Sequence, residues 1–101
     1  MEIKQSTAKG KKLTAIFYKD GKKVKTSHFG AAGMDDYTLT KDKEQRKRYR
    51  DRHAKDLKRG NYMSPGHLSY YILWGDSTSR NTNISSYLKR FGIKKHKSTK
   101  K

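Results

Sequence analysis

The fold is decided by residues 13–29, which read LTAIFYKDGKKVKTSHF. Residues 13–18 and 23–29 are rich in β-branched and aromatic side chains, which favour extended strands. Between them lies Asp20-Gly21, a dipeptide typical of a two-residue hairpin turn because both of its central positions need positive φ angles. The stretch therefore predicts a β-hairpin.

A two-residue turn also sets the expected pairing of the two strands. One face of the hairpin should pair Phe17 with Val24, Ala15 with Thr26 and Leu13 with His28. The other face should pair Tyr18 with Lys23 and Ile16 with Lys25, which gives the hairpin a core side and a basic side. Residues 1–4 are expected to add a short strand through Ile3.

A strongly basic stretch follows, and it predicts a helix over residues 41–59, KDKEQRKRYRDRHAKDLKR. Tyr49, His53 and Leu57 recur every four residues and form a semi-apolar stripe that should face the core. Thr40 is the expected N-cap, and Gly60-Asn61 the expected end. Acid-first pairs at i,i+4 should offset part of the crowded charge; they are Asp42–Arg46, Glu44–Arg48 and Asp51–Lys55.

Two more helices are expected in the second half of the chain. Ser64-Pro65 is a typical helix start, and residues 67–74 are apolar almost all round, so they should form the central buried element before Gly75. Thr82 or Asn83 should cap the last helix, which should end at Gly92. Its apolar face is expected to consist of Ile84, Tyr87, Leu88 and Phe91.

Together these elements predict a small single α+β domain over residues 1–92, in which an N-terminal β-hairpin packs on three short helices. Hydrophobic residues make up 31% of the chain, so the core should be small and depend on its aromatic side chains. Residues 93–101 form a lysine-rich tail without any acid, which should be disordered unless a partner orders it.

Charge and composition limit the classes of partner. The 26 Lys and Arg outnumber nine Asp and Glu, and the formal net charge of +17 indicates a negatively charged partner. Without cysteine the chain has no disulfide and no Cys-based zinc site. The longest apolar run, residues 70–74, is too short to enter a bilayer as a span, and the first residues lack the apolar segment of a signal peptide. We expect a soluble protein, made inside a cell, with no membrane insertion.

The basic helix and the tail hold the candidate binding residues. They could bind phosphates, or acidic protein surfaces through bidentate Arg–carboxylate pairs. The candidates are Lys41, Lys43, Arg46, Lys47, Arg48, Arg50, Arg52, Lys55, Lys58, Arg59, Lys94, Lys95 and Lys97. Tyr49 is a candidate for stacking on a base, although its stripe is expected to face the core. The simpler alternative is a solvated charged face with no partner.

Other motifs give weaker signals. The turn at residues 28–33 has two glycines but lacks the Lys-Ser/Thr of a phosphate-binding loop, so we expect a hinge anchored by Phe29. The aromatic run at residues 70–74 is expected to anchor the core rather than to offer a stacking platform. No HExxH, GxSxG or Cys/His zinc spacing occurs. The chain is therefore expected to be non-enzymatic, with no catalytic residue, cofactor or metal.

Several short motifs follow one another between residues 12 and 76. They are His28-Phe29-Gly30-Ala31, Asp36-Tyr37-Thr38, Lys41-Asp42, Arg48-Tyr49, Arg52-His53, Ser69 and Leu73-Trp74. In this order they resemble a family of small basic proteins encoded by large double-stranded DNA viruses of eukaryotes. Thr40 and His67-Leu68 depart from its pattern, which usually has His and a Phe-Trp pair there. The resemblance implies a virus-encoded, virion-associated protein and supplies no catalytic residues.

Two functions from different classes remain open. One is a minor-capsid-type structural protein of a large DNA virus, which bridges acidic surfaces of capsid or other proteins electrostatically. The other is sequence-nonspecific DNA or RNA binding during packaging or condensation of the viral genome. The chain has no recognisable nucleic-acid-binding module, which favours the structural role. The expected location is the virion, and the host cytoplasm or nucleus during assembly.

Overall fold

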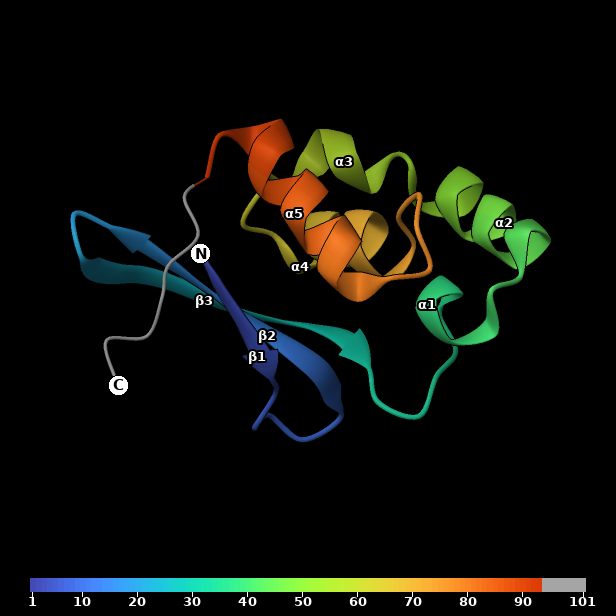
Figure 1. The fold of residues 1–101 in the computed structure, drawn as a ribbon, viewed down its shortest axis with the longest axis horizontal. Coiled ribbons are helices and arrows are strands. Elements are labelled where there is room, and N and C mark those ends of the chain that lie inside the picture. Colours follow the sequence, from blue (N-terminus) through green and yellow to red (C-terminus); the bar gives the residue numbers. More distant parts are fainter. Residues whose placement is uncertain (94–101) are drawn as a thin grey trace.

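A computed structural model describes residues 1–93, which form a three-stranded antiparallel sheet with helices on one face (Figure 1). The strands are β1 (Glu2–Gln5), β2 (Lys11–Lys19) and β3 (Lys22–Ala31), in the spatial order β1-β2-β3. The helices are α1 (Tyr37–Thr40), α2 (Lys43–His53), α3 (Asp56–Arg59), α4 (Pro65–Leu68), the π-helix η1 (Ser69–Leu73) and α5 (Arg80–Phe91). The predicted α+β class is confirmed, and β1 is the short strand expected at the N-terminus.

The β2–β3 hairpin turns at the predicted dipeptide. Asp20 and Gly21 have φ angles of 54° and 80°, and Tyr18 lies opposite Lys23 as expected. Beyond that pair the predicted register is wrong, because a β-bulge inserts Val24 and places Lys25 opposite Phe17. One extra residue moves every following side chain of β3 to the other face of the sheet.

The bulge decides which residues of β3 enter the core. Ala15 now pairs with Ser27, Ile16 with Thr26, and Leu13 with Phe29, instead of Thr26, Lys25 and His28. Ser27 and Phe29 are buried, whereas Val24 is 55% exposed. The core face of β2 is the predicted one, since Ala15 and Phe17 belong to the hydrophobic core. The predicted basic side is less open than expected, because Ile16 on that side is buried as well.

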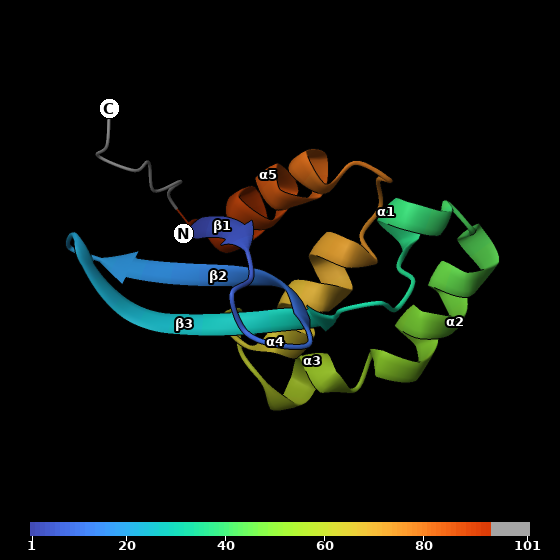
Figure 2. The same ribbon diagram turned by 90° about the horizontal axis from the view of Figure 1, so that it is seen from below.

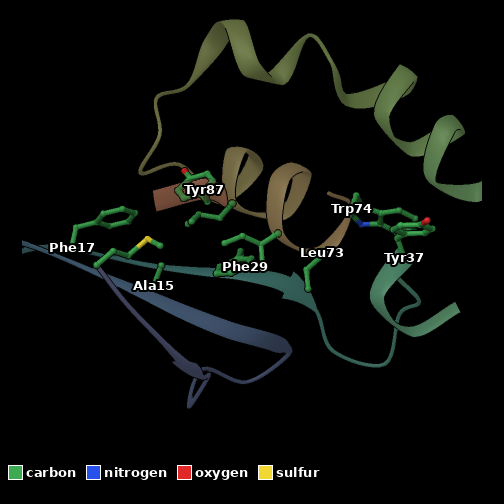
Figure 3. Close-up of a cluster of buried hydrophobic side chains, with 10 residues drawn as sticks. Ala15, Phe17, Phe29, Tyr37, Leu73, Trp74 and Tyr87 are labelled. Atoms are coloured by element: carbon green, nitrogen blue, oxygen red, sulfur yellow. The ribbon is translucent and has the colours of Figure 1, made fainter. Parts of the chain in front are cut away.

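The central buried element predicted at residues 67–74 is confirmed. Helix α4 starts after the N-cap Ser64 with Pro65 in its first turn, and η1 continues it, with the Trp74 N–H donating to the Ser69 carbonyl at 3.0 Å. With α5, these helices cover the sheet, and the core lies between the two layers (Figure 3). Leu73 approaches Gly30 so closely that a Cβ at residue 30 would lie 2.6 Å from Leu73 Cδ1.

Helix α5 begins earlier than predicted. Its N-cap is Ser79, whose hydroxyl accepts a hydrogen bond from Thr82 N, rather than Thr82 or Asn83. Asn83 is instead buried, and its amide donates to the carbonyls of Ile72 and Ser77, which ties α5 to η1. Gly92 ends the helix as predicted, with a φ angle of 63°.

The basic stretch forms two helices instead of the single one predicted for residues 41–59. Asp42 caps α2 by accepting from the N–H groups of Glu44 and Gln45, whereas Thr40 belongs to the separate helix α1. A turn at Ala54 and Lys55 then separates α3, which packs against α4. None of the three predicted acid-first pairs forms among residues 1–93.

The hairpin tip and α2 lie at opposite ends of the molecule, as both ribbon views show (Figure 1, Figure 2). Helices α1 and α2 lie beyond the end of β3, beside the end of η1. Within the described part of the chain, no helix combines the length and apolar character needed to span a membrane. The predicted tail falls, apart from Ile93, outside the described residues.

Candidate functional site

A cleft of about 630 Å³ lies between α2 and the end of β3. This volume is within the range of about 300–1,000 Å³ that is common for ligand-binding sites. Four parts of the chain line it: Lys12 of β2, residues 30–36, one face of α2, and η1 with Trp74. The cleft therefore depends on the packing of α2 beside η1.

Helix α2 presents one of its faces to this cleft. The lining residues of α2 are Gln45, Arg48, Tyr49, Arg52 and His53, which follow the i, i+3, i+4, i+7, i+8 spacing of a single helix face. Two members of the predicted stripe, Tyr49 and His53, are on this face, while the third, Leu57, belongs to α3.

Tyr49 forms the aromatic centre of the cleft wall. Its ring stacks on Trp74 with a centroid distance of 4.3 Å and an interplanar angle of 7°, and on His53 at 4.3 Å and 30°. Burial, together with the nearby charge of Asp56, raises the pKa of the Tyr49 phenol above its ordinary value. Tyr49 thus packs against the core as predicted, and its stacking partners come from the protein itself.

Arg46 and Arg50 are on the side of α2 that is anchored to the protein body. Arg46 Nε donates to the Gly75 carbonyl at 2.6 Å, and its Nη2 to Asp76 Oδ1 at 2.6 Å. Arg50 Nη1 donates to the Trp74 carbonyl at 2.8 Å, and the guanidinium lies 4.2 Å from the centroid of the Tyr70 ring. Sequence reasoning assigned both arginines to partner binding, whereas here they satisfy carbonyl groups just after η1.

Arg48 and Arg52 have the opposite character. Both are exposed and line the cleft, and within residues 1–93 neither guanidinium has a hydrogen bond or an ion pair. Their donors are therefore available for a ligand. Among the predicted binding cations within residues 1–93, these two are the ones that the fold brings to the cleft, beside the predicted stacking residue Tyr49.

The other predicted binding residues lie elsewhere on the surface. Lys47 forms an exposed ion pair with Asp51 at 3.0 Å. Lys41, Lys43, Lys55, Lys58 and Arg59 are exposed along the segment that runs from α1 to the end of α3, outside the cleft. Lys94, Lys95 and Lys97 fall outside the described residues.

Asp36 is a buried charge at the cleft that sequence reasoning missed. Its Oδ2 accepts from Lys12 Nζ at 2.5 Å and from Arg80 Nη2 at 3.2 Å, and its Oδ1 accepts from Thr38 N at 2.9 Å and from the Thr38 hydroxyl. Burial alone would raise the pKa of Asp36, but these hydrogen bonds and the two cations together hold it below its ordinary value. The carboxylate thereby joins β2, α1 and α5.

A sequence signal for part of this site was present. Asp36 is followed two residues later by Thr38, and Asp is a preferred N-cap because its carboxylate accepts from free backbone N–H groups of the first turn. Lys12 and Arg80 gave no such signal, because their pairing with Asp36 spans 24 and 44 residues.

The cleft has a small positive net charge. Lys12, Arg48 and Arg52 supply three cations against the carboxylates of Asp35 and Asp36, which leaves a formal charge of +1 when His53 is counted as neutral. Such a site can hold an anion by hydrogen bonds from guanidinium groups. Within residues 1–93, no group of three His, Cys, Asp or Glu side chains is arranged to hold a metal ion.

The short motifs of the sequence, except Lys41-Asp42, meet at this cleft. Ten of its fifteen lining residues belong to them: Gly30, Ala31, Asp36, Arg48, Tyr49, Arg52, His53, Ser69, Leu73 and Trp74. These residues come from segments that are far apart in the chain, and the fold of α2 over the end of η1 brings them together.

Comparison with known proteins identifies one family. No curated protein and no solved structure matches the chain. The model of a family of unknown function, DUF5754, matches residues 1–53, which include the sheet, α1 and α2 but not η1. Because the match covers more than half of the 101 residues, the protein belongs to the DUF5754 family of unknown function.

Proposed function

We propose that the protein is a non-enzymatic basic structural protein that bridges acidic surfaces electrostatically. The observation that carries this proposal is that exposed cations lie on the hairpin tip and on α2, two elements at opposite ends of the molecule (Figure 1). The hairpin tip carries Lys19, Lys22, Lys23 and Lys25, and the other end carries the exposed cations of α2.

The distance between the two ends favours two separate partners. The longest dimension of the molecule is 40 Å, whereas salt screens exposed charges over about 8 Å at physiological ionic strength. The fields of the two ends are therefore nearly independent in the cell. A molecule of this kind can attract one acidic surface at each end.

The resemblance to small basic proteins of large DNA viruses suggests what these surfaces are. In that setting the protein would be a minor-capsid-type component of the virion, and its partners would be capsid proteins or other acidic proteins. It would be present in the host cytoplasm or nucleus while particles assemble.

Sequence-nonspecific binding of DNA or RNA, in packaging or condensing the viral genome, is the second candidate. It is supported by the spread of exposed lysines along both strands of the hairpin tip and along α2 and α3, because phosphate contacts need charge but no specific geometry. The same cations would then follow a nucleic-acid backbone rather than two protein surfaces.

Bridging can be tested with carboxylate-coated particles. The wild-type protein should both bind the particles and aggregate them, as measured by co-sedimentation and by dynamic light scattering. Lys22→Glu/Lys23→Glu at the hairpin tip and Lys43→Glu/Lys47→Glu on α2 should each leave one basic end, so each variant should bind but fail to aggregate. Aggregation by either variant at the wild-type level would contradict the two-ended mechanism.

The choice between the two candidates requires biological polyanions. Binding to purified capsid protein, duplex DNA and single-stranded RNA would be compared over a salt series. Capsid binding that persists at physiological salt while nucleic-acid binding is lost supports the structural role. Persistent nucleic-acid binding whose logarithm falls linearly with the logarithm of salt concentration supports the second candidate, and the slope counts the phosphate contacts.

A further inference from the structure

We propose that the cleft beside α2 is a docking site for an acidic peptide segment of the partner that also carries an apolar side chain. This inference rests on the proposed function, because it assumes an acidic protein partner, and it assigns the place where that partner is recognised specifically. The exposed lysines would supply long-range attraction, and the cleft would supply the local contacts.

Arg48 and Arg52 form the half of the cleft that binds the carboxylates of the peptide. Arg48 and Arg52 are one helical turn apart on α2, and neighbours at i,i+4 have their side chains on the same face of a helix. A guanidinium presents five donors in a planar fork that fits a carboxylate bidentately. The pair is therefore suited to two carboxylates, or to one carboxylate held from both sides.

The other half of the cleft is lined by apolar residues, which would contribute nothing to the binding of an anion alone. Met34, on the segment between β3 and α1, is 63% exposed, although an exposed thioether chain gains nothing from water. Leu73 and Trp74 from the other layer line the same cleft. Burial of an apolar side chain between these groups would stabilise the complex in addition to the ion pairs.

The aromatic lining of the cleft favours a peptide over a single-stranded nucleic acid. Base stacking, a main source of single-strand affinity, lacks a suitable surface here, because the Tyr49 ring is already stacked on Trp74 and His53. Recognition of an acidic and apolar peptide uses both halves of the lining.

Trp74 provides a direct readout, since it is the single tryptophan of the chain and lines the cleft. The probe would be the hexapeptide EDLFED, acetylated and amidated, with EDSGED as the matched acidic peptide that lacks apolar side chains. We expect saturable binding of EDLFED, seen as a change in Trp74 fluorescence. The affinity for EDSGED should be lower by about tenfold, which is the factor that burial of one apolar side chain contributes to an affinity.

Two double variants separate cleft recognition from general charge. Arg48→Gln/Arg52→Gln should weaken EDLFED binding by about tenfold or more, through loss of charge-assisted hydrogen bonds. Lys43→Gln/Lys55→Gln removes the same charge from exposed positions outside the cleft, and should change affinity by less than about threefold. Met34→Gln should weaken EDLFED but not EDSGED.

The outcomes separate this inference from the proposed function. Equal weakening by both double variants, or a preference for a six-nucleotide oligothymidylate over EDLFED, would overturn the docking site. If Arg48→Gln/Arg52→Gln aggregates carboxylate-coated particles normally but loses EDLFED, both proposals are supported. If the wild-type protein aggregates the particles but does not bind EDLFED, the bridging function is supported and the docking site is contradicted.

Discussion

At the scale of single residues, Asp36 is the charge on which the cleft wall depends. It is 1% exposed and holds Lys12, Arg80 and the first turn of α1 at once. Replacing it by Asn would leave the Lys12 ammonium, which is mostly buried, without its counter-charge. Asp36→Asn should therefore lower the free energy of unfolding by about 2–4 kcal/mol in urea denaturation.

Asp35→Asn is the matched control, because its carboxylate is the exposed neighbour in the sequence, and it should change stability by less than about 0.5 kcal/mol. The pH dependence gives a second check. The pKa of Asp36 is lower in the folded protein, so its contribution is present above the unfolded value of about 3.9 and is lost as pH falls through the folded value. A stability difference between wild type and Asp36→Asn that already vanished near pH 6 would contradict this assignment.

His67 is a buried histidine whose Nδ1 lacks a hydrogen-bond partner within residues 1–93. Burial lowers its pKa, so the folded protein keeps the ring neutral at a pH where the unfolded chain, with a pKa of about 6.5, takes up a proton. The contribution of His67 to the free energy of unfolding should be fully present above pH 7 and should decrease as pH falls below about 6.5. His67→Phe should remove this slope, with a difference on the order of 1 kcal/mol between pH 7 and pH 5.

Thermal denaturation of both proteins over this pH range provides the measurement. Changes in the other titrating groups are common to wild type and His67→Phe, so only the difference between the two curves reports on His67. Parallel curves would show that the ring becomes protonated without cost to the folded state.

At the scale of elements, α2 is held without any buried side chain of its own. Its attachment includes the Arg46 and Arg50 hydrogen bonds to the carbonyls after η1, the Arg46–Asp76 ion pair and the stacking of Tyr49 on Trp74. Arg46→Gln/Arg50→Gln should destabilise the protein by about 1–3 kcal/mol and speed amide hydrogen exchange across α2. Arg48→Gln/Arg52→Gln has the same charge change on the same helix and should leave both measurements nearly unchanged.

This pair of variants tests the division of α2 into an anchored side and a binding side. If the two double variants destabilised the protein equally, net charge rather than the named hydrogen bonds would control the position of the helix. Because the second variant is also the one used in the peptide experiment, its stability decides whether a loss of binding can be attributed to the cleft.

The elements also show what could be predicted from the sequence. Asp20-Gly21 predicted the hairpin turn because that signal is local, and the apolar spacing of residues 84–91 predicted the last helix for the same reason. The bulge at Val24 could not be predicted, since it is favoured by how Ser27 and Phe29 pack against the helices. The end of α2 was missed too, because the turn at Ala54 and Lys55 depends on the docking of α3 against α4.

The candidate site was predictable only in part. The sequence predicted the basic surface, but it assigned all four arginines between residues 46 and 52 to partner binding. Two of them donate to carbonyls that lie 29 and 24 residues away in the sequence, and two line a cleft made from four segments. Only the tertiary packing distinguishes these roles.

At the scale of the whole molecule, the net charge of +17 opposes the folded state. Folding confines the charges of residues 1–93 to a body with a radius of gyration of 13.4 Å, whereas the unfolded chain lets them move apart. Sodium chloride screens this repulsion, because the Debye length decreases from about 30 Å at 0.01 M to about 10 Å at 0.1 M. The midpoint of thermal unfolding should therefore rise with salt, and a gain of about 1 kcal/mol would correspond to about 4–8 °C for a domain of this size.

Lys22→Glu/Lys23→Glu provides the control for this last prediction, because replacing two positive charges by two negative ones lowers the net charge from +17 to +13. The register places Lys22 directly opposite Lys19, so the change also removes the repulsion between these two lysines across the hairpin. The variant should start from a higher melting temperature at low salt and rise less steeply with added sodium chloride. An equal or steeper rise would mean that salt acts through surface exclusion rather than through screening. A shallower rise would mean that the isolated protein is destabilised by the same cations that attract its partners, so a bound acidic surface would stabilise the fold as it forms the bridge.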